Sequence, residues 1–143
     1  MSTKPIEASQ VDRARLAAVC REHGLDLLLL YGSHATGHAR PGSDVDVGLV
    51  RPGGRLTLNE TAALQTSLEP FLPAGDLDLV DLRRVPGLLR HLACERGRLL
   101  YERTPAAFAA FRVLAWNLYQ DERIELRRYD SEGIKQALAR LAS

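Results

Sequence analysis

The segment from Leu25 to Val50 constrains the fold more than any other part of the 143-residue chain. It opens with an apolar run over Leu27–Tyr31, long enough for a buried strand, which stops at Gly32 where the chain must turn. The turn-forming sequence Arg40–Ser43 then leads into a second apolar stretch. We therefore expect two neighbouring strands, joined by a glycine turn and a loop.

Gly32 and Ser33 follow the first of these strands with chemistry that suits an anion. A glycine lets the backbone come close to a phosphate. Ser33 adds a hydroxyl and an amide at the expected first turn of a short helix, where unpaired N–H groups favour anions. The pair therefore predicts a phosphate-binding turn.

Asp44 and Asp46 stand at the start of the second apolar stretch. On a strand, residues two apart point to the same face, so both carboxylates should converge while Val45 and Val47 point the other way. Two carboxylates this close repel each other unless a cation lies between them, and hard oxygen ligands suit Mg²⁺. The spacing therefore predicts a metal site.

A third acid is expected on a neighbouring strand, because two-metal phosphoryl chemistry clamps both the attacking and the leaving oxygen. Asp78 is our first choice, since an acid between Leu77 and Leu79 needs a partner to offset its burial. Asp76 shares its parity and stays open as an alternative. Asp81 has the opposite parity and is expected to start the following loop.

This pattern of Gly-Ser, ten residues, Asp-x-Asp and a later acid in an apolar strand resembles the polymerase-β-like nucleotidyltransferase superfamily. The small size resembles its minimal nucleotidyltransferase (MNT) branch, and the likeness extends through the DLDLVDL strand to the stretch 88–103. It implies an α/β (α+β) fold of the polymerase-β-like type, in which helices pack on a small mixed sheet.

The resemblance also implies a Mg²⁺-dependent nucleotidyltransferase that uses ATP. It assigns nucleotide binding to Gly32, Ser33 and Ser43. It assigns catalysis and the binding of two Mg²⁺ ions to Asp44, Asp46 and Asp78.

Two positions depart from the usual pattern of the branch. His34 stands where arginine is common, and Gly42 precedes Ser43 where an acid or asparagine is frequent. Neither change removes a metal ligand. His34 can still donate to a phosphate, but without the permanent charge and planar fork of arginine.

Outside this region, helical spacing predicts helices at about 11–23, 59–71 and 87–96. A short strand is expected at 99–101. Cys20 and Cys94 each lie among apolar residues and are expected to be small buried hydrophobes. Six arginines gather in the second half of the chain, where either a patch for phosphate or an acidic partner, or the commoner solvated face, is expected. They are Arg83, Arg84, Arg90, Arg96, Arg98 and Arg103.

The last forty residues predict a helical tail, so we divide the chain into a minimal nucleotidyltransferase domain (1–103) and a tail (104–143) of the same compact unit. Thr104–Pro105 has the chemistry of an N-cap and first turn, and apolar residues recur at helical spacing over Phe108–Tyr119. Gly133 is expected to break the helix before a second apolar stripe formed by Ile134, Leu138 and Leu141. Such faces serve as core, self-association or partner surface.

A similar tail occurs in MNT proteins that act as antitoxins beside a HEPN-domain toxin, which implies transfer of AMP from ATP to a toxin hydroxyl, typically of a tyrosine. The alternatives are a nucleotidyltransferase for a small alcohol such as an aminoglycoside, and a catalytically silent antitoxin that neutralises by binding. A net charge of +1 gives no general attraction to nucleic acid. The absence of a signal peptide or an apolar membrane span predicts a cytoplasmic protein, with homo-oligomers or toxin hetero-oligomers both open.

Overall fold

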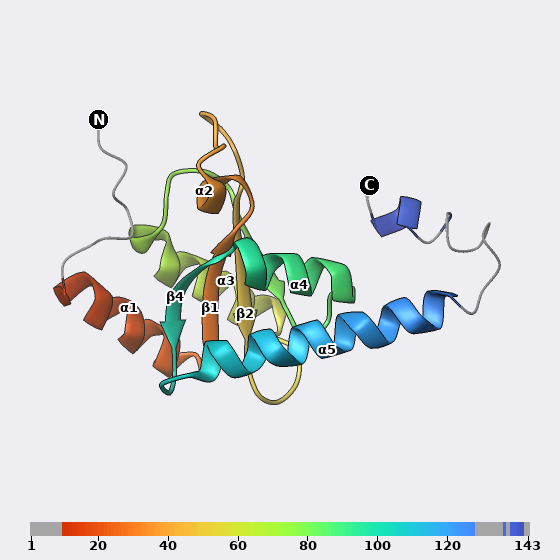
Figure 1. Ribbon diagram of the computed structural model, residues 1–143. Helices are drawn as coiled ribbons and strands as arrows, with labels where there is room; N and C mark the ends of the chain where they lie inside the picture. The colour runs from red at the N-terminus through yellow and green to blue at the C-terminus, as the bar shows by residue number, and fades with distance from the viewer. Residues whose placement is uncertain (1–9, 128–135, 137, 142–143) are drawn as a thin grey trace.

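The structure, a computed structural model, describes residues 10–127, 136 and 138–141. Its elements (Figure 1) are, in chain order, α1 (Gln10–Glu22), β1 (Leu27–Tyr31), α2 (Ser33–Thr36), β2 (Val45–Val50), α3 (Leu58–Leu68), the 3₁₀ turn η1 (Glu69–Phe71), β3 (Leu77–Asp81), α4 (Gly87–Arg96), β4 (Arg98–Glu102) and α5 (Ala107–Arg127). Gly133 and Ile134, for which a break and an apolar stripe are predicted, lie outside the described residues.

The four strands form one mixed sheet in the order β3-β2-β1-β4. β1 pairs antiparallel with both β2 and β4, whereas β2 and β3 are parallel. A parallel pair needs a crossover connection, and α3 supplies it. The predicted small mixed sheet is therefore confirmed, and β3 lies at one edge.

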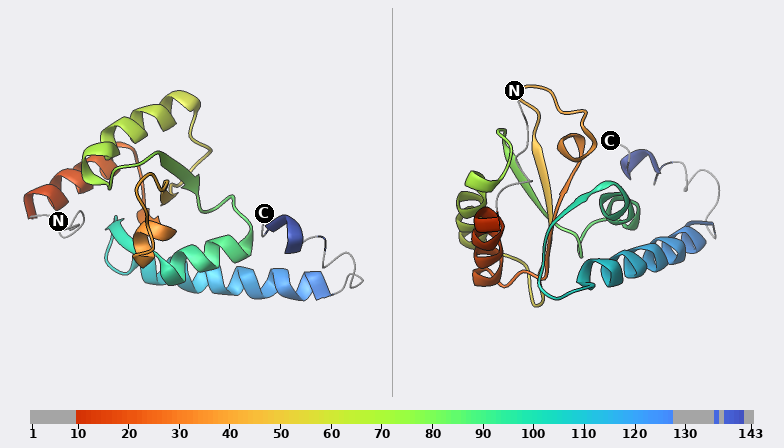
Figure 2. Two further views of the ribbon diagram at one scale, coloured as in Figure 1. Left: turned by 90° about the horizontal axis from the view of Figure 1, so that it is seen from above. Right: turned by 60° about the vertical axis from the view of Figure 1, so that its left-hand side comes forward.

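Helices cover both faces of the sheet, with α1 and α3 on one side and α4 and α5 on the other (Figure 2). Leu28 and Leu30 of β1 belong to the first core, and Leu27 and Leu29 belong to the second. A strand buried on both faces reads as a continuous apolar run, which is why β1 is four leucines long before its tyrosine.

Cys20 and Cys94 are both free and buried, one in each core. Burial raises the pKa of the Cys20 thiol to about 12 and that of Cys94 to about 11. Both side chains therefore stay protonated near neutral pH and pack as small hydrophobes, as the sequence predicts.

Two predicted helix ends are wrong. The second helix ends at Leu68 and continues only as the turn Glu69–Phe71, because Pro70 has no N–H to donate to a helix. Thr104–Pro105 does not start the tail helix, which begins at Ala107 after Ala106 adopts a positive φ of 68°. The Glu102 carboxylate accepts the N–H of Phe108 at 3.1 Å and caps the helix instead of Thr104.

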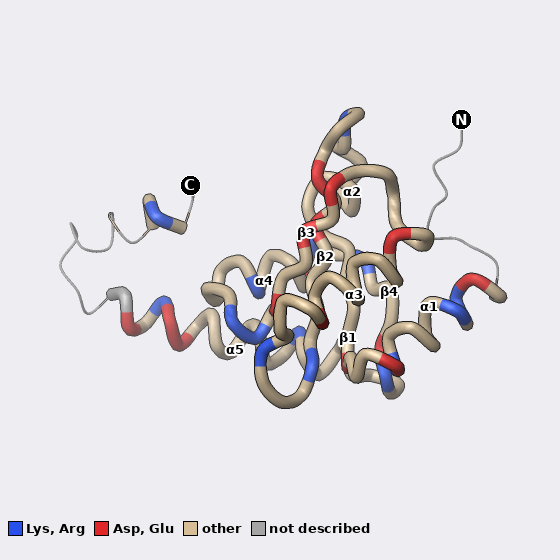
Figure 3. Tube along the Cα trace, turned by 180° about the vertical axis from the view of Figure 1, so that it is seen from behind, with Lys and Arg blue, Asp and Glu red and all other residues tan. Residues whose placement is uncertain are grey.

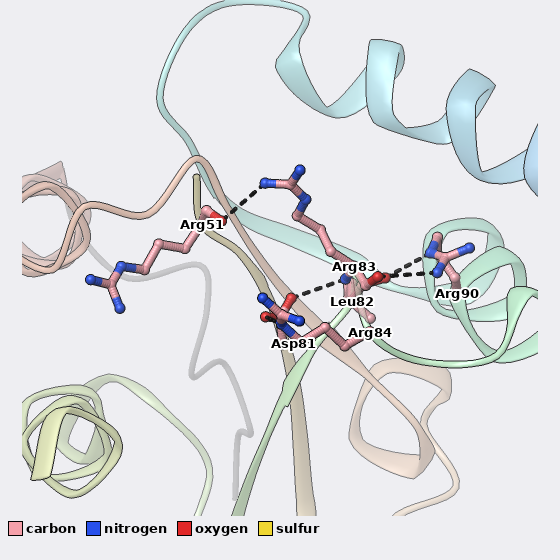
Figure 4. A network of polar contacts seen from close by, with 6 residues as sticks. All are labelled: Arg51, Asp81, Leu82, Arg83, Arg84 and Arg90. Carbon is pink, nitrogen blue, oxygen red and sulfur yellow. Dashed lines mark hydrogen bonds and ion pairs between the residues drawn. The ribbon is translucent and has the colours of Figure 1, made fainter. Parts of the chain in front are cut away.

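Arg90 corrects the expectation of an arginine surface (Figure 4). Its side chain is 7% exposed and donates to the carbonyl oxygens of Leu82 (2.7 Å), Val85 (2.9 Å) and Arg83 (3.4 Å). These acceptors lie in the connection between β3 and α4. Arg90 is therefore a structural residue that holds this connection, and neither a phosphate ligand nor part of a solvated face.

None of the described helices combines the length and the apolar character needed to cross a membrane.

Candidate active site

The predicted site residues gather at the end of the sheet where β1 stops and β2 and β3 begin. Figure 3 shows acidic positions beside α2 at this end of the strands. The antiparallel pairing of β1 and β2 places Tyr31 opposite Asp46, and the parallel pairing of β2 and β3 places Asp46 beside Asp78. Three segments distant in sequence therefore contribute to one end of the sheet.

Gly32 makes the turn out of β1 directly against Asp46. Its φ of 72° and ψ of −155° form a backbone conformation that side-chain-bearing residues rarely adopt. A Cβ atom at this position would overlap the Oδ2 atom of Asp46 and lie 3.2 Å from its Cγ. Glycine is required here on both counts, so the turn and the acid form one compact unit.

Ser33 is the first residue of the one-turn helix α2, as predicted, beside the glycine turn. Ser43 has a role in its own loop, where its hydroxyl oxygen accepts the Arg40 N–H at 2.8 Å. This bond closes the turn before β2. Nucleotide contacts by Ser33 and Ser43 stay predictions.

The two acids of the Asp-x-Asp motif differ in their surroundings. Asp46 lies inside β2 and is half-buried, whereas Asp44 is exposed and precedes the strand, which begins at Val45. Val45 and Val47 are fully buried in the core on the α1 and α3 side, so the predicted alternation along this segment is correct.

Asp78 is the third acid beside Asp46, with which it is paired in register. Asp76 precedes β3, and its backbone carbonyl accepts the N–H of Val45 at 2.8 Å. The expectation that Asp78 is buried is wrong, because it is exposed on an edge strand whose Leu77 and Leu79 pack into the core. Asp81 ends β3 and accepts the Arg83 N–H at 3.0 Å, in the turn that follows.

The three carboxylates repel one another around Asp46. Burial, then Asp78, then Asp44 raise the pKa of the Asp46 carboxyl, and nearby His34 lowers it. Burial and the charges of Asp46 and Asp78 also raise the pKa of the Tyr31 hydroxyl to about 12. The site is therefore a concentration of negative charge that a cation would stabilise.

Sequence reasoning missed Tyr31 as a neighbour of this site and missed the backbone contact of His34. Tyr31 lies beside the acids as the last residue of a strand that is expected only as scaffold. His34 turns toward the loop and lies with its Nε2 atom 3.3 Å from the Ser43 carbonyl oxygen. The family spacing marked His34 as a departure but gave no sign of this contact.

The chain matches the protein family described as "Polymerase beta, Nucleotidyltransferase" over residues 15–106, well over half of its length. It belongs to this nucleotidyltransferase family. A structure described as that of a minimal nucleotidyltransferase is 30% identical and matches with a TM-score of 0.53, covering 68% of this chain and 98% of that chain. The predicted family, its MNT branch and its fold are thus confirmed. A search of the curated proteins finds no match.

Two further solved structures share the fold of this nucleotidyltransferase. A toxin–antitoxin crystal structure with AMP-PNP is 23% identical, with a TM-score of 0.64, and the match covers 81% of this chain and 93% of that chain. A complex of a tri-AMPylated Shewanella oneidensis HEPN toxin with an MNT antitoxin is 22% identical, with a TM-score of 0.59, and the match covers 83% and 92%. At these identities the likeness shows the fold.

The family implies a metal ion at these acids. Within residues 10–127, 136 and 138–141, no group of three or more His, Cys, Asp or Glu side chains stands arranged to hold a metal ion. The donor chemistry nevertheless suits Mg²⁺, since Asp44, Asp46 and Asp78 offer only hard oxygens, and burial together with the charges of Asp78 and Asp44 raises the pKa of Asp46. Metal binding by these acids stays a prediction.

A cavity of about 330 Å³ lies at the opposite end of the sheet from the acids, against the first residue of β1 and the last of β2. Its wall includes Leu27, Val50 and Phe111 and the ion pair Arg103–Asp26, whose charged atoms are 3.6 Å apart. None of the predicted site residues lines it. The acids therefore lie apart from this cavity.

Gly32→Ala is expected to impair the site while the protein still folds. The new methyl group forces Asp46 aside, and the positive φ adds about 1 kcal/mol of strain. A displaced reactive group can lower a rate by roughly 10²-fold, so nucleotide transfer should fall at least about tenfold. Gly53→Ala, at another positive φ but with open space around the Cβ position, is the control and should keep wild-type activity. Equal activities of the two variants would contradict the close approach.

Proposed function

We propose that this nucleotidyltransferase is an antitoxin that transfers AMP from ATP to a hydroxyl group, a tyrosine in our proposal, of a HEPN-domain toxin and so silences it. The observation that carries the chemistry is the convergence of Gly32, Asp46 and Asp78 at one end of the sheet. The structural neighbours that contain AMP-PNP or an AMPylated HEPN toxin support the partner and the donor.

Each site residue has a role in this proposal. Asp44, Asp46 and Asp78 would hold two Mg²⁺ ions, which supply charge stabilisation for the triphosphate and its leaving pyrophosphate. The Gly32 turn and Ser33 would hold the outer phosphates through backbone N–H groups and the serine hydroxyl. The acceptor oxygen attacks the α-phosphorus of ATP, and the bond between that phosphorus and the leaving pyrophosphate breaks. Asp78 accepts the proton of the attacking hydroxyl.

Two alternatives make different demands on the same chain. A nucleotidyltransferase for a small alcohol would consume ATP without labelling any protein. A catalytically silent antitoxin would bind and neutralise its toxin equally well without its acids. The electronegative cluster around Asp46 favours a catalytic role over the silent one, since unpaired carboxylates this close lower stability unless they serve a ligand.

The decisive experiment incubates the purified chain with α-labelled ATP, Mg²⁺ and extract of the source cell. A labelled protein band that requires Asp44 and Asp46 is the expected result, and its mass identifies the toxin. The double variant Asp44→Asn/Asp46→Asn should give no labelled band. If it still binds the same partner as the wild type does, catalysis is separated from binding. Label that appears only in a small molecule would favour the aminoglycoside-type alternative.

We further propose that the outer face of α5 binds this partner. The helix passes under α4 and continues beyond it (Figure 1), with Phe111 and Ala115 buried against the core. No charged residue occurs over Val113–Gln120, and Val113 and Leu114 are 61% and 49% exposed. Trp116 is 46% exposed although its ring lies 5.0 Å from that of His91 on α4. A helix that is apolar on both faces normally has a second partner.

Val113→Glu is expected to weaken toxin binding at least about tenfold, because a charge would enter an apolar interface centre. Dissociation constants measured by calorimetry with the purified toxin give the comparison. Leu58→Glu is the matched control, since Leu58 is 90% exposed on α3, away from α5, and should bind as the wild type does. Equal weakening by both variants would argue against α5 as the binding face.

A further inference from the structure

Asp44 is held in place by its neighbours rather than by its own side chain. It is exposed and precedes β2, and among the described residues no hydrogen bond or ion pair engages its carboxylate. The position of this acid therefore depends on how the backbone is fixed at Ser43 and Val45, on either side of it.

The segment that leads into β3 contacts the backbone on both sides of Asp44. The N–H of Val45 donates to the Asp76 carbonyl at 2.8 Å. Gly75 packs so closely on the Ser43 carbonyl that a Cβ atom on it would overlap the oxygen. These contacts locate the segment relative to the strand that carries Asp78, but not relative to the glycine turn.

His34 reaches the same loop from α2. Its Nε2 atom lies 3.3 Å from the carbonyl oxygen of Ser43, nine residues along the chain. A carbonyl oxygen can only accept, so Nε2 is the nitrogen that carries the hydrogen. The bond starts two residues after Gly32 and ends one residue before Asp44, and thus ties the phosphate-binding turn to the loop of the first acid.

We propose that His34 is a positioning residue that sets Asp44 relative to the Gly32 turn through the Ser43 carbonyl. The inference rests on the proposed nucleotidyl transfer for its catalytic meaning. With Nε2 engaged on the backbone, His34 acts on the carboxylate that follows Ser43 and does not contact a phosphate through that nitrogen. The contact of His34 is therefore with the backbone of the loop.

Three variants test the proposal. His34→Gln keeps an N–H donor close to the position of Nε2, and His34→Ala removes it. His38→Ala removes the side chain of a nearby exposed histidine, whose ring Nδ1 atom lies 3.0 Å from the Thr36 hydroxyl. The measurement is the Mg²⁺ concentration that half-saturates AMP-PNP binding. Loss of an orienting hydrogen bond behind a metal ligand costs about 10- to 100-fold in metal affinity, so His34→Ala should raise this concentration at least about tenfold. His34→Gln should stay within about threefold of the wild type, and His38→Ala should not differ from it.

A second readout keeps the proposal testable without ligands. Amide hydrogen exchange over residues 43–46 of the metal-free protein should speed up in His34→Ala but not in His38→Ala. Unchanged exchange in His34→Ala would overturn the positioning role. So would a His34→Ala protein that binds AMP-PNP more weakly without Mg²⁺ but needs the same Mg²⁺ concentration as the wild type. A wild-type protein that binds no Mg²⁺ with AMP-PNP would instead refute the proposed function, and the exchange data would still decide the role of His34.

Discussion

Replacing Asp44 and Asp46 together by asparagine is expected to lower the rate of AMP transfer by at least about 10³-fold, because several kcal/mol of transition-state stabilisation depend on the ions that these carboxylates would hold. Initial rates of label transfer to the purified toxin, at saturating ATP, measure the effect. Asp76→Asn is the matched control. Its carboxylate is not among the charges that raise the pKa of Asp46, and its rate should stay within a fewfold of the wild type.

The same substitutions should make the metal-free protein more stable. Since the folded-state pKa of Asp46 is raised, its ionised carboxylate opposes folding above that pKa, and the cost fades as the pH falls through it. The gain in melting temperature of Asp46→Asn over the wild type should therefore be largest near neutral pH and shrink in acid. A double variant that loses both activity and stability would indicate a general folding defect and not the loss of a ligand.

Arg90→Leu is expected to destabilise the protein by about 3 kcal/mol, because it leaves up to three carbonyl oxygens in the connection between β3 and α4 without a donor. For a domain of this size the melting temperature should fall by roughly 10 °C. Denaturant unfolding followed by circular dichroism measures the difference. Arg90→Lys retains a charge but not the fork of the guanidinium, so its free energy of unfolding should lie between those of the wild type and Arg90→Leu.

Arg96→Ala provides the comparison within the same helix. Arg96 is exposed in the last turn of α4, so its removal should change the free energy of unfolding by no more than about 0.5 kcal/mol. If the Arg90 and Arg96 variants unfolded alike, the hydrogen bonds of Arg90 would contribute little to the fold.

Local patterns in the sequence predict most of this architecture. The apolar run before Gly32 and the alternation after Asp44 determine β1 and β2, because strand burial repeats every two residues or continues without a break. Asp76 and Asp78 have equal parity along one segment, so alternation alone cannot decide between them. Parallel register selects Asp78, and register depends on tertiary packing.

The features that the sequence did not predict all depend on contacts between distant segments. Arg90 looks like its arginine neighbours until the connection after β3 folds over it. Asp78 seems buried among leucines, but an edge strand leaves its acidic face open. Glu102 replaces Thr104 as the helix cap because β4 places its carboxylate beside the N–H of Phe108. Composition and local spacing do not indicate such contacts between distant segments.

Because β3 is an edge strand, the part of the candidate site that it carries should detach more readily than the part on the central strands. Asp46 lies in β2 and Gly32 directly follows β1, and these two strands form the antiparallel pair in the middle of the sheet, whereas Asp78 belongs to a half-buried strand with only one neighbour. Strands with fewer buried contacts open more readily than the rest of a protein. A brief detachment of β3 would thus withdraw Asp78 and free the Val45 N–H from the Asp76 carbonyl, which helps to hold Asp44. Gly32 and Asp46 would stay in place, so the protein would lose its proposed chemistry briefly while the rest of the fold remained intact.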